Sequence, residues 1–157
     1  MQIPEEYKKT VKSALNMLAY AENTKKGLEN KLLAKGYSPE SVEFALEYVE
    51  SKRLLDEKRY FYRLVETLAK GKCYGERRIR MELIHKGFDP LLISECFNDA
   101  LSILELDDIC FSFALKNYKG DREKLYAKLI RMGHPSERAV RVCKKIGTMY
   151  DEYEKTP

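Results

Sequence analysis

One short segment holds most of the residue types that could do chemistry in this chain: residues 71–88, GKCYGERRIRMELIHKGF. A glycine–lysine loop can bind phosphate, cysteine with histidine can bind a metal ion, and clustered arginines can bind nucleic acid. A Walker loop has four residues between its glycines and then Gly-Lys-Ser/Thr, whereas Gly75 is followed by Glu76 and Arg77. A dinucleotide-binding loop follows a strand, and the residues before Gly71 have helical spacing. We therefore predict that Gly71 ends one helix and that Gly75 opens the next.

The cysteines and histidines do not have the spacing of a metal site or a catalytic site. The four cysteines form no CxxC motif and lie near no histidine pair; they are Cys73, Cys96, Cys110 and Cys143. This pattern predicts free thiols. Neither His85 nor His134 has a partner at the spacing of a ligand set or a triad. We expect no catalytic residue, no metal and no cofactor.

The composition indicates a small soluble protein. The chain has 157 residues, of which 44% are hydrophobic, and its formal net charge is +4. No run approaches the roughly 18 consecutive apolar residues of a membrane span, and the first residues, MQIPEEYKKT, lack the apolar region of a signal peptide. We expect a cytoplasmic protein with no membrane contact.

Apolar residues recur at helical spacing along most of the chain, and no long stretch alternates with a period of two. The pattern predicts an all-α protein with nine helices, at about 5–22, 24–35, 39–52, 57–70, 75–86, 90–104, 107–118, 121–132 and 136–153. Ser38 and Asp89, each followed by proline, are typical N-cap residues. Asp121, which follows Gly120, is a third.

An internal repeat organises these helices. LENKLLAKGYSP at 28–39, IRMELIHKGFDP at 79–90 and LYAKLIRMGHPS at 125–136 share one register. Each segment ends in a glycine followed by a ring, and the glycines (Gly36, Gly87 and Gly133) lie 51 and 46 residues apart. The register predicts equivalent buried positions for Leu32, Leu83 and Leu129.

Three tandem three-helix repeats are the simplest interpretation of this register. Leu55-Asp56 and Leu106-Asp107 both place aspartate twenty residues after a repeat glycine. We therefore divide the chain into repeats at 1–54, 55–105 and 106–157, the last with a C-terminal tail. Because tandem repeats contact mainly their neighbours, we expect an elongated, curved array that presents an extended surface to a partner.

Two of the three arginines at 77–80 have a predicted partner on their own helix. Glu76 with Arg80, and Arg78 with Glu82, stand four residues apart and can form ion pairs. Arg77 has no acidic residue three or four positions away. Of the three arginines, Arg77 is therefore the one least explained by ion pairs within its own helix.

Positive charge is concentrated in the second helix of each repeat and the loop before it. Segments 25–35, 70–86 and 116–131 carry net charges of +3, +4 and +4, which leaves −7 for the remainder. Chance unevenness among exposed helices is one explanation, and a basic ridge facing an anionic protein or nucleic acid is the one we favour. The candidate partner-binding residues are Lys25, Lys26, Lys31, Lys35, Lys70, Lys72, Arg77, Arg78, Arg80, Lys86, Lys119, Arg122, Lys124, Lys128 and Arg131.

A DNA-reading helix-turn-helix is a rival interpretation of the glycine turns. The helices after Gly36 and Gly87 carry carboxylates that DNA would repel, namely Glu40, Glu43, Glu47, Glu50, Glu95 and Asp99. Only the helix after Gly133 has the charge for a groove, through Arg138, Arg141, Lys144 and Lys145. This pattern disfavours sequence-specific reading and leaves contact with a DNA backbone open.

Residues 54–93, LLDEKRYFYRLVETLAKGKCYGERRIRMELIHKGFDPLLI, carry the most specific pattern in the chain. Its distinctive positions are Leu55-Asp56-Glu57, Arg59-Tyr60, Gly71, Gly75, Arg78-Ile79, Leu83 and Gly87. The first repeat adds Ala14-Leu15, Leu18, Leu28, Lys31-Leu32 and Lys35-Gly36-Tyr37-Ser38. In these positions the chain resembles the RecX family, the regulators of the RecA recombinase, over about residues 14–146.

The resemblance implies a tandem array of three-helix repeats that binds in the groove of the RecA–single-stranded-DNA filament. There it would modulate recombinase, ATPase and coprotease activity, with inhibition as the expected direction. The implied partners are the RecA filament and single-stranded DNA, contacted directly or through the filament, by a monomer without catalytic residues. The alternative is a general nucleic-acid-binding helical repeat protein, whose basic helices contact phosphates directly and whose affinity falls steeply with salt.

Overall fold

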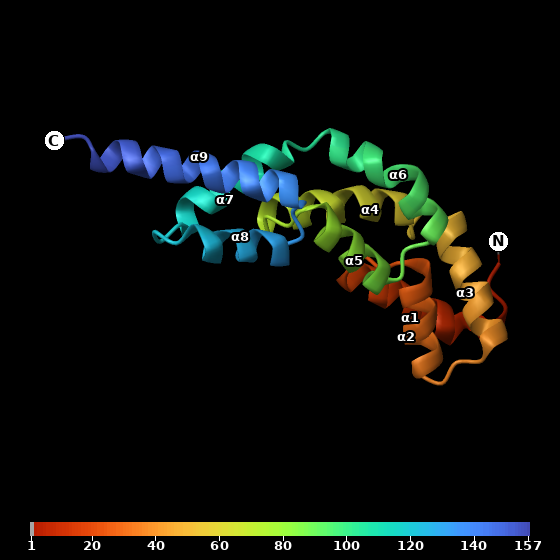
Figure 1. Ribbon diagram of the computed structural model, residues 1–157. Helices are drawn as coiled ribbons and strands as arrows, with labels where there is room; N and C mark the ends of the chain where they lie inside the picture. The colour runs from red at the N-terminus through yellow and green to blue at the C-terminus, as the bar shows by residue number, and fades with distance from the viewer. Residues whose placement is uncertain (1) are drawn as a thin grey trace. The chain divides into compact units, whose positions relative to one another are not determined.

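Residues 2–157 are described by a computed structural model, and their regular structure is entirely helical (Figure 1). The α-helices are α1 (Lys8–Tyr20), α2 (Lys25–Ala34), α3 (Pro39–Ser51), α4 (Glu57–Glu66), α5 (Glu76–Lys86), α6 (Pro90–Ser102), α7 (Leu106–Asn117), α8 (Arg122–Arg131) and α9 (Ser136–Glu154). A 3₁₀ turn, η1 (Glu5–Tyr7), precedes α1, and a π-helical segment, η2 (Thr67–Gly71), follows α4. These nine α-helices in residues 2–157 confirm the predicted all-α class. Within that range, no helix combines the length and apolar character needed to cross a membrane.

Side-chain caps define where several helices begin. Ser38 Oγ accepts a hydrogen bond from the Ser41 N–H at 3.2 Å, and Asp121 Oδ1 accepts one from the Lys124 N–H at 3.1 Å. Both residues are N-caps, as predicted. Asp89 likewise accepts a hydrogen bond from a backbone N–H at the start of α6.

The repeat glycines define where the second helices end. Gly36, Gly87 and Gly133 follow α2, α5 and α8 with φ values of 93°, 90° and 93°. This left-handed backbone favours glycine because it has no Cβ. The predicted register is therefore a shared backbone conformation as well as a shared sequence.

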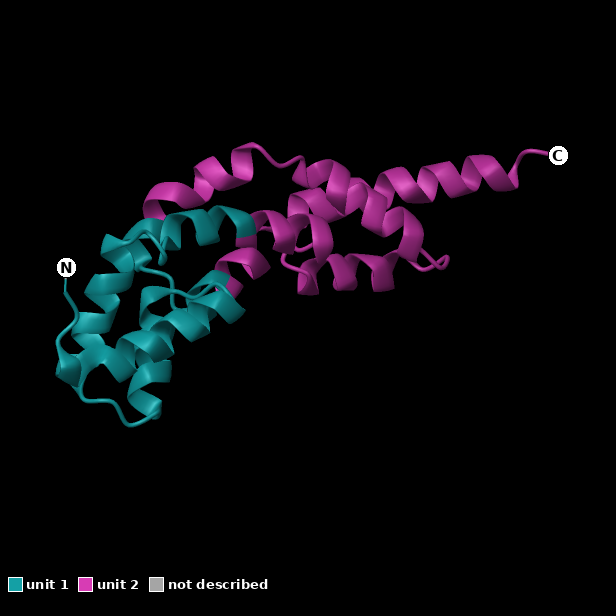
Figure 2. Cartoon of the chain, turned by 180° about the vertical axis from the view of Figure 1, so that it is seen from behind, with its two compact units in different colours: residues 1–63, 83–92 teal, residues 64–82, 93–157 magenta. Residues whose placement is uncertain are grey.

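Backbone contacts divide the chain into two compact units (Figure 2). Unit 1 consists of residues 1–63 and 83–92, and unit 2 consists of residues 64–82 and 93–157. The second repeat contributes segments to both units. Repeat boundaries at 54/55 and 105/106 stay a proposal.

Unit 1 is built around the first repeat. In Figure 1, α1, α2 and α3 lie together at the red-to-orange end of the chain. They enclose a buried apolar cluster: Val11, Ala14, Leu28, Leu32, Val42, Ala45, Leu46, Val49 and Leu55. Phe88, the ring after the second repeat glycine, packs edge-on against Phe61 with ring centroids 5.5 Å apart.

Unit 2 contains the third repeat, in which α9 packs against both α7 and α8. The core between these helices consists of Cys110, Ala114, Leu125, Leu129, Ala139, Val142, Cys143 and Ile146. Burial raises the pKa of Cys110 to about 11 and also raises the pKa of Cys143. Both thiols therefore stay protonated at neutral pH and act as small apolar core residues.

Leu83 and Ile84 provide a direct test of the repeat register. Leu83 is 0% exposed, like its counterparts Leu32 and Leu129, whereas Ile84 is 60% exposed. Leu83→Ala should lower the free energy of unfolding by about 2–5 kcal/mol because it leaves a cavity. Ile84→Ala should change it by less than about 0.5 kcal/mol. Urea unfolding of the two variants measures both values, and equal losses would refute the register at this position.

Candidate partner-binding surface

Backbone hydrogen bonds join the N-terminus of α5 to the C-terminus of α8 within unit 2. The N–H groups of Gly75 and Arg77 donate to the carbonyls of Met132 and Gly133 at 2.9 and 3.1 Å. A helix leaves N–H groups unsatisfied at its start and carbonyls unsatisfied at its end, so the two ends satisfy each other. The opposite ends of the two helix dipoles also meet. The amides that a phosphate-binding loop would offer are thus used by the fold.

There is no room for a side chain at this junction. A Cβ on Gly75 would lie 2.5 Å from the backbone nitrogen of His134 and 2.6 Å from the carbonyl of Gly133. At Gly71, by contrast, a Cβ would meet only Thr67 Cγ2, at 4.0 Å. Gly71 ends η2, and the Gly75 carbonyl accepts the first helical hydrogen bond of α5, from Ile79. The predicted helix stop and start are confirmed, and the close approach adds a second reason for Gly75.

An equivalent junction occurs in unit 1, between the start of α2 and the end of α5. The Thr24 hydroxyl donates to the Lys86 carbonyl at 3.0 Å and accepts from the Gly27 N–H at 2.9 Å. Thr24 stands twelve residues before Gly36, as Gly75 stands twelve before Gly87. These junctions were not predicted from the sequence. The constant spacing from helix start to repeat glycine was the signal that could have revealed them.

Glu76 pairs with Arg138, 62 residues away, and the predicted Glu76–Arg80 pair is wrong. Both carboxylate oxygens of Glu76 accept hydrogen bonds from the Arg138 guanidinium, whose side chain is only 11% exposed. Arg138 also donates to Asp107, which accepts a second bond from Arg141 at 2.8 Å. The hydrogen bond from Arg138 lowers the pKa of Asp107. Arg138 and Arg141 are two of the four cations that the helix-turn-helix interpretation would place in a DNA groove. Both instead hold α9 to neighbouring helices, α5 and α7.

Arg78 and Arg80 also contact the fold. The Arg80 guanidinium lies over the Phe97 ring, 4.5 Å from its centroid. Because Arg80 makes this contact, the Glu76 carboxylate pairs with Arg138 and not with Arg80. Arg78 donates to Glu82 at 3.1 Å, which confirms the predicted pair. Its guanidinium also lies 4.6 Å from the centroid of the Tyr74 ring. A cation–π contact at a partly exposed site contributes about 0.5–1 kcal/mol.

Arg77 differs from its neighbours. The sequence predicted no partner for it on its own helix. In the structure its side chain is exposed and forms no ion pair with any residue from 2 to 157. Lys72, on the preceding loop, is exposed and unpaired within the same range. Lys26 stands ten residues before Gly36, as Arg77 stands ten before Gly87, and it too is exposed without an ion pair in the described chain. Two repeats therefore place an uncommitted cation at the same position.

The other predicted cations of the first two repeats are exposed, and most of them are engaged. Lys25 and Lys70 form ion pairs with glutamates, at 2.9 and 3.1 Å. Lys31 donates to the side chain of an asparagine at 2.6 Å, and Lys35 donates to a serine hydroxyl at 3.4 Å. Lys86 is exposed and has no ion pair in the part of the chain that the structure describes.

In the third repeat, Arg122 holds α8 to α9. It pairs with Asp151 at 3.2 Å, and its guanidinium occupies the space where Gly147 would otherwise carry a side chain. Lys128 lies 5.4 Å from the centroid of the Phe113 ring. Three further predicted cations are exposed and unpaired among residues 2–157: Lys119, Lys124 and Arg131.

His134 is fully buried at the α5–α8 junction. Its Nε2 lies 2.9 Å from the Cys73 carbonyl oxygen, which can only accept, so Nε2 carries the proton. Nδ1 is then free to accept from Arg138 at 3.3 Å. Burial lowers the pKa of His134, so the ring is neutral at pH 7. His85, in contrast, is exposed.

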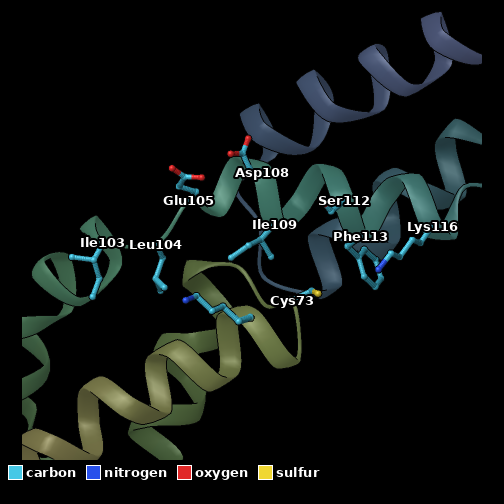
Figure 3. Close-up of a pocket in the computed structure, with 10 residues that line it drawn as sticks. Cys73, Ile103, Leu104, Glu105, Asp108, Ile109, Ser112, Phe113 and Lys116 are labelled. Atoms are coloured by element: carbon cyan, nitrogen blue, oxygen red, sulfur yellow. The ribbon is translucent and has the colours of Figure 1, made fainter.

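A cavity of about 500 Å³ lies in unit 2 beside α7 (Figure 3). Figure 3 shows Glu105 and Asp108 near the start of α7, Lys116 farther along it, and the Cys73 sulfur across from the helix. Of the predicted binding residues only Lys70 lines this cavity, so the charge pattern of the sequence did not predict a site here. Nowhere in residues 2–157 do three or more His, Cys, Asp or Glu side chains gather in a way that could hold a metal ion.

Comparison with known proteins gives consistent matches. Models of the first and second three-helix domains of RecX match residues 12–48 and 56–96, about half of the chain. The regulatory protein RecX of Chlorobium phaeobacteroides (strain BS1) is 29% identical over 136 residues, which cover 82% of this chain and 87% of the relative. That of Chlorobium limicola (strain DSM 245 / NBRC 103803 / 6330) is 32% identical over 100 residues, or 62% of this chain and 59% of the relative. The chain belongs to the RecX family.

The fold agrees with that of a solved RecX structure. The crystal structure of RecX from Lactobacillus salivarius superposes with a TM-score of 0.78 at 20% identity, over 93% of this chain and 99% of the other. RecX proteins are regulatory proteins by name. Lys26, Lys72 and Arg77 lie inside the ranges that match the RecX domains, whereas the α8 cations lie beyond them.

Substitution by alanine should affect stability differently at Gly75 and at Gly71. Gly75→Ala should lower the free energy of unfolding by about 1–3 kcal/mol, because its Cβ would meet the backbone around Gly133. Gly71→Ala meets no such obstacle and should leave stability equal or slightly higher, because alanine restricts the unfolded chain. Thermal unfolding of both variants provides the comparison. A Gly75→Ala melting temperature equal to that of the parent would contradict the backbone junction.

His134 should make stability depend on pH. Its pKa in the folded protein lies below the ordinary value of 6.5, so the unfolded chain takes up the proton more readily. The stability contribution is complete above pH 6.5 and is lost as the pH falls below it, by at most about 1.4 kcal/mol per pH unit. Urea unfolding at pH 7.5 and pH 5.5 should show this loss in the parent. His134→Gln should reduce the difference and the control His85→Gln should preserve it; an unchanged difference in His134→Gln would exclude His134 as its source.

Proposed function

We propose that this RecX-family chain binds the RecA filament formed on single-stranded DNA and restrains its activity. The basic second helices face the filament groove, which exposes protein carboxylates and DNA phosphates. A chain lying in the groove occupies space needed by a second DNA strand and holds neighbouring RecA subunits in one arrangement. Strand exchange, ATP hydrolysis and coprotease activity are thereby inhibited. This role belongs to homologous recombination, DNA repair and the SOS response.

One observation carries this proposal: some arginines are held by contacts within the fold, whereas others are exposed and make no ion pair in residues 2–157. Arg138 and Arg78 pair with glutamates, and Arg80 packs on an aromatic ring. Arg77 and its first-repeat counterpart Lys26 are exposed and have no ion pair in residues 2–157. An anionic partner can bind such uncommitted cations without breaking an ion pair of the fold, so their side-chain charge is fully available to it.

The exposed apolar residue beside Arg77 favours a protein as part of that partner. Met81 stands four residues after Arg77 on α5 and is 66% exposed. Side chains four residues apart on a helix share a face, so α5 presents a cation and a flexible apolar group together. Protein interfaces combine such groups, whereas DNA phosphates recognise the charge alone.

General nucleic-acid binding is the second candidate function, and the unpaired cations of α8 favour it. Binding by phosphate contacts alone would be as tight on bare DNA as on RecA-coated DNA and would weaken steeply as salt rises. A salt series with and without RecA on the DNA separates the two functions. We further propose that the protein acts as a monomer in the cytoplasm.

Reversal of the Arg77 charge tests the proposed function. Arg77→Glu should preserve helical content and melting temperature, because the side chain has no ion pair to lose in residues 2–157. Affinity for the RecA–single-stranded-DNA filament should fall at least about tenfold at low salt, with a parallel loss of ATPase inhibition. Lys72→Glu should add to the effect. Filament co-sedimentation and ATPase assays measure both quantities.

Two controls make the Arg77 result specific. Lys144→Glu changes the net charge equally at another exposed lysine, on α9, and should bind filaments nearly as well as the parent. Arg80→Glu should lose some stability, because its contact with Phe97 is removed, with a smaller functional loss than Arg77→Glu. Parent-like filament binding by Arg77→Glu at low salt would exclude this part of α5 from the contact.

A further inference from the structure

A second cavity of unit 2 gathers three uncommitted cations of the third repeat, Lys119, Lys124 and Arg131, together with Lys128, which lies over the Phe113 ring. It has a volume of about 400 Å³ and lies along α8 and the loop before it. Four cations line it, namely Lys119, Lys124, Lys128 and Arg131. The single lining carboxylate, Asp121, already accepts a hydrogen bond as the N-cap of α8. The cavity therefore has an excess of positive charge.

The arrangement of these cations is unfavourable for the helix alone. Lys124 and Lys128 are four residues apart, and Arg131 follows three residues later, so all three share one face of α8. Like charges at these spacings repel each other and destabilise a helix. A neighbouring face of α8 is committed to the core through Leu125 and Leu129, which are 4% and 0% exposed. A bound anion would offset the repulsion without disturbing that packing.

The lining of this cavity fits phosphate better than a protein surface. Its apolar lining residues, Leu125 and Ala127, are buried or half-buried. The cavity beside α7, by contrast, includes Ile103, which is 74% exposed. A protein interface has an apolar centre, whereas contacts to a nucleic-acid backbone are charge–charge contacts that lysine can make as a point charge.

We propose that this cavity binds phosphodiester groups of single-stranded nucleic acid directly. The inference rests on the proposed function, in which the chain lies on a filament that contains such a strand. It assigns different contacts to different repeats: Arg77 and Met81 of α5 contact protein, and the α8 cavity contacts the DNA backbone. The third repeat thus supplies a salt-sensitive affinity for the DNA strand itself.

Fluorescence anisotropy with a labelled (dT)18 oligonucleotide, without RecA, tests the site on the full chain. The parent should bind at 50 mM salt. The triple variant Lys124→Gln/Lys128→Gln/Arg131→Gln should bind at least about tenfold more weakly, and its slope of log affinity against log salt should be smaller by about 2, since each lost contact removes about 0.7. Its melting temperature should stay close to that of the parent, because relief of the repulsion along α8 offsets the lost contact of Lys128 with the Phe113 ring.

A matched triple variant controls for net charge. Lys9→Gln/Lys12→Gln/Lys58→Gln also takes the formal charge from +4 to +1 and changes exposed lysines of α1 and α4. It should bind (dT)18 within about threefold of the parent. Equal losses in the two triple variants, or no binding of (dT)18 by the parent, would overturn the cavity site. Binding of labelled poly-glutamate, measured in the same way, would overturn it in favour of a protein partner if the α8 triple variant lost that binding while its (dT)18 binding stayed unchanged.

Filament binding distinguishes this proposal from the proposed function. If the α8 triple variant keeps full (dT)18 affinity while the parent binds RecA filaments, the cavity site is wrong and the proposed function stands. If the parent binds (dT)18 through the cavity but binds RecA-coated DNA no more tightly than bare DNA, the cavity site stands and the proposed function is wrong. Arg77→Glu should retain (dT)18 affinity while losing filament affinity.

Discussion

The close approach of two backbones at Gly75 and Gly133 is the constraint on which the rest of unit 2 depends. The first N–H groups of α5 donate to the last carbonyls of α8, and neither glycine has room for a Cβ. Each helix end supplies what the other lacks, so no water or ligand is needed to satisfy these groups. In unit 1 the hydroxyl of Thr24 makes the equivalent contact with the carbonyl of Lys86.

This junction determines which charges serve the fold and which remain available. Once the N-terminus of α5 meets the C-terminus of α8, Glu76 is brought to Arg138, and His134 is buried against the Cys73 carbonyl. The same geometry leaves Arg77 exposed, with its backbone N–H bonded to Gly133 and its side chain unpaired among residues 2–157. A single residue thus contributes its main chain to stability, and we propose that its side chain contributes to recognition.

Local patterns predicted the parts of the fold that local physics controls. The spacing of apolar residues predicted nine helices, and the register of the repeat glycines predicted the buried positions of Leu32, Leu83 and Leu129. The structure adds that these glycines share a left-handed backbone. The partners of Glu76 and Arg80 could not be predicted this way. Glu76 meets a residue 62 positions away, and Arg80 meets Phe97 from the next helix, so tertiary contacts outweigh a favourable i,i+4 spacing.

The same limit applies to the candidate binding surface. The sequence showed that positive charge gathers in the second helices, but charge counting cannot tell an engaged cation from a free one. Arg122, for example, belongs to the predicted ridge, yet it fills the space over Gly147 and pairs with Asp151. The structure reduces fifteen candidates to a few with uncommitted charge, and it shows that those of α8 line a cavity.

The central claim is that the exposed side of the α5 N-terminus contacts RecA, and site-specific photo-crosslinking tests it most directly. A photoreactive benzoylphenylalanine would replace Arg77 in one variant and Glu95, an exposed residue of α6, in another. On RecA–single-stranded-DNA filaments, position 77 should crosslink to RecA strongly and position 95 weakly. Strong crosslinking at position 95 with none at position 77 would contradict the account.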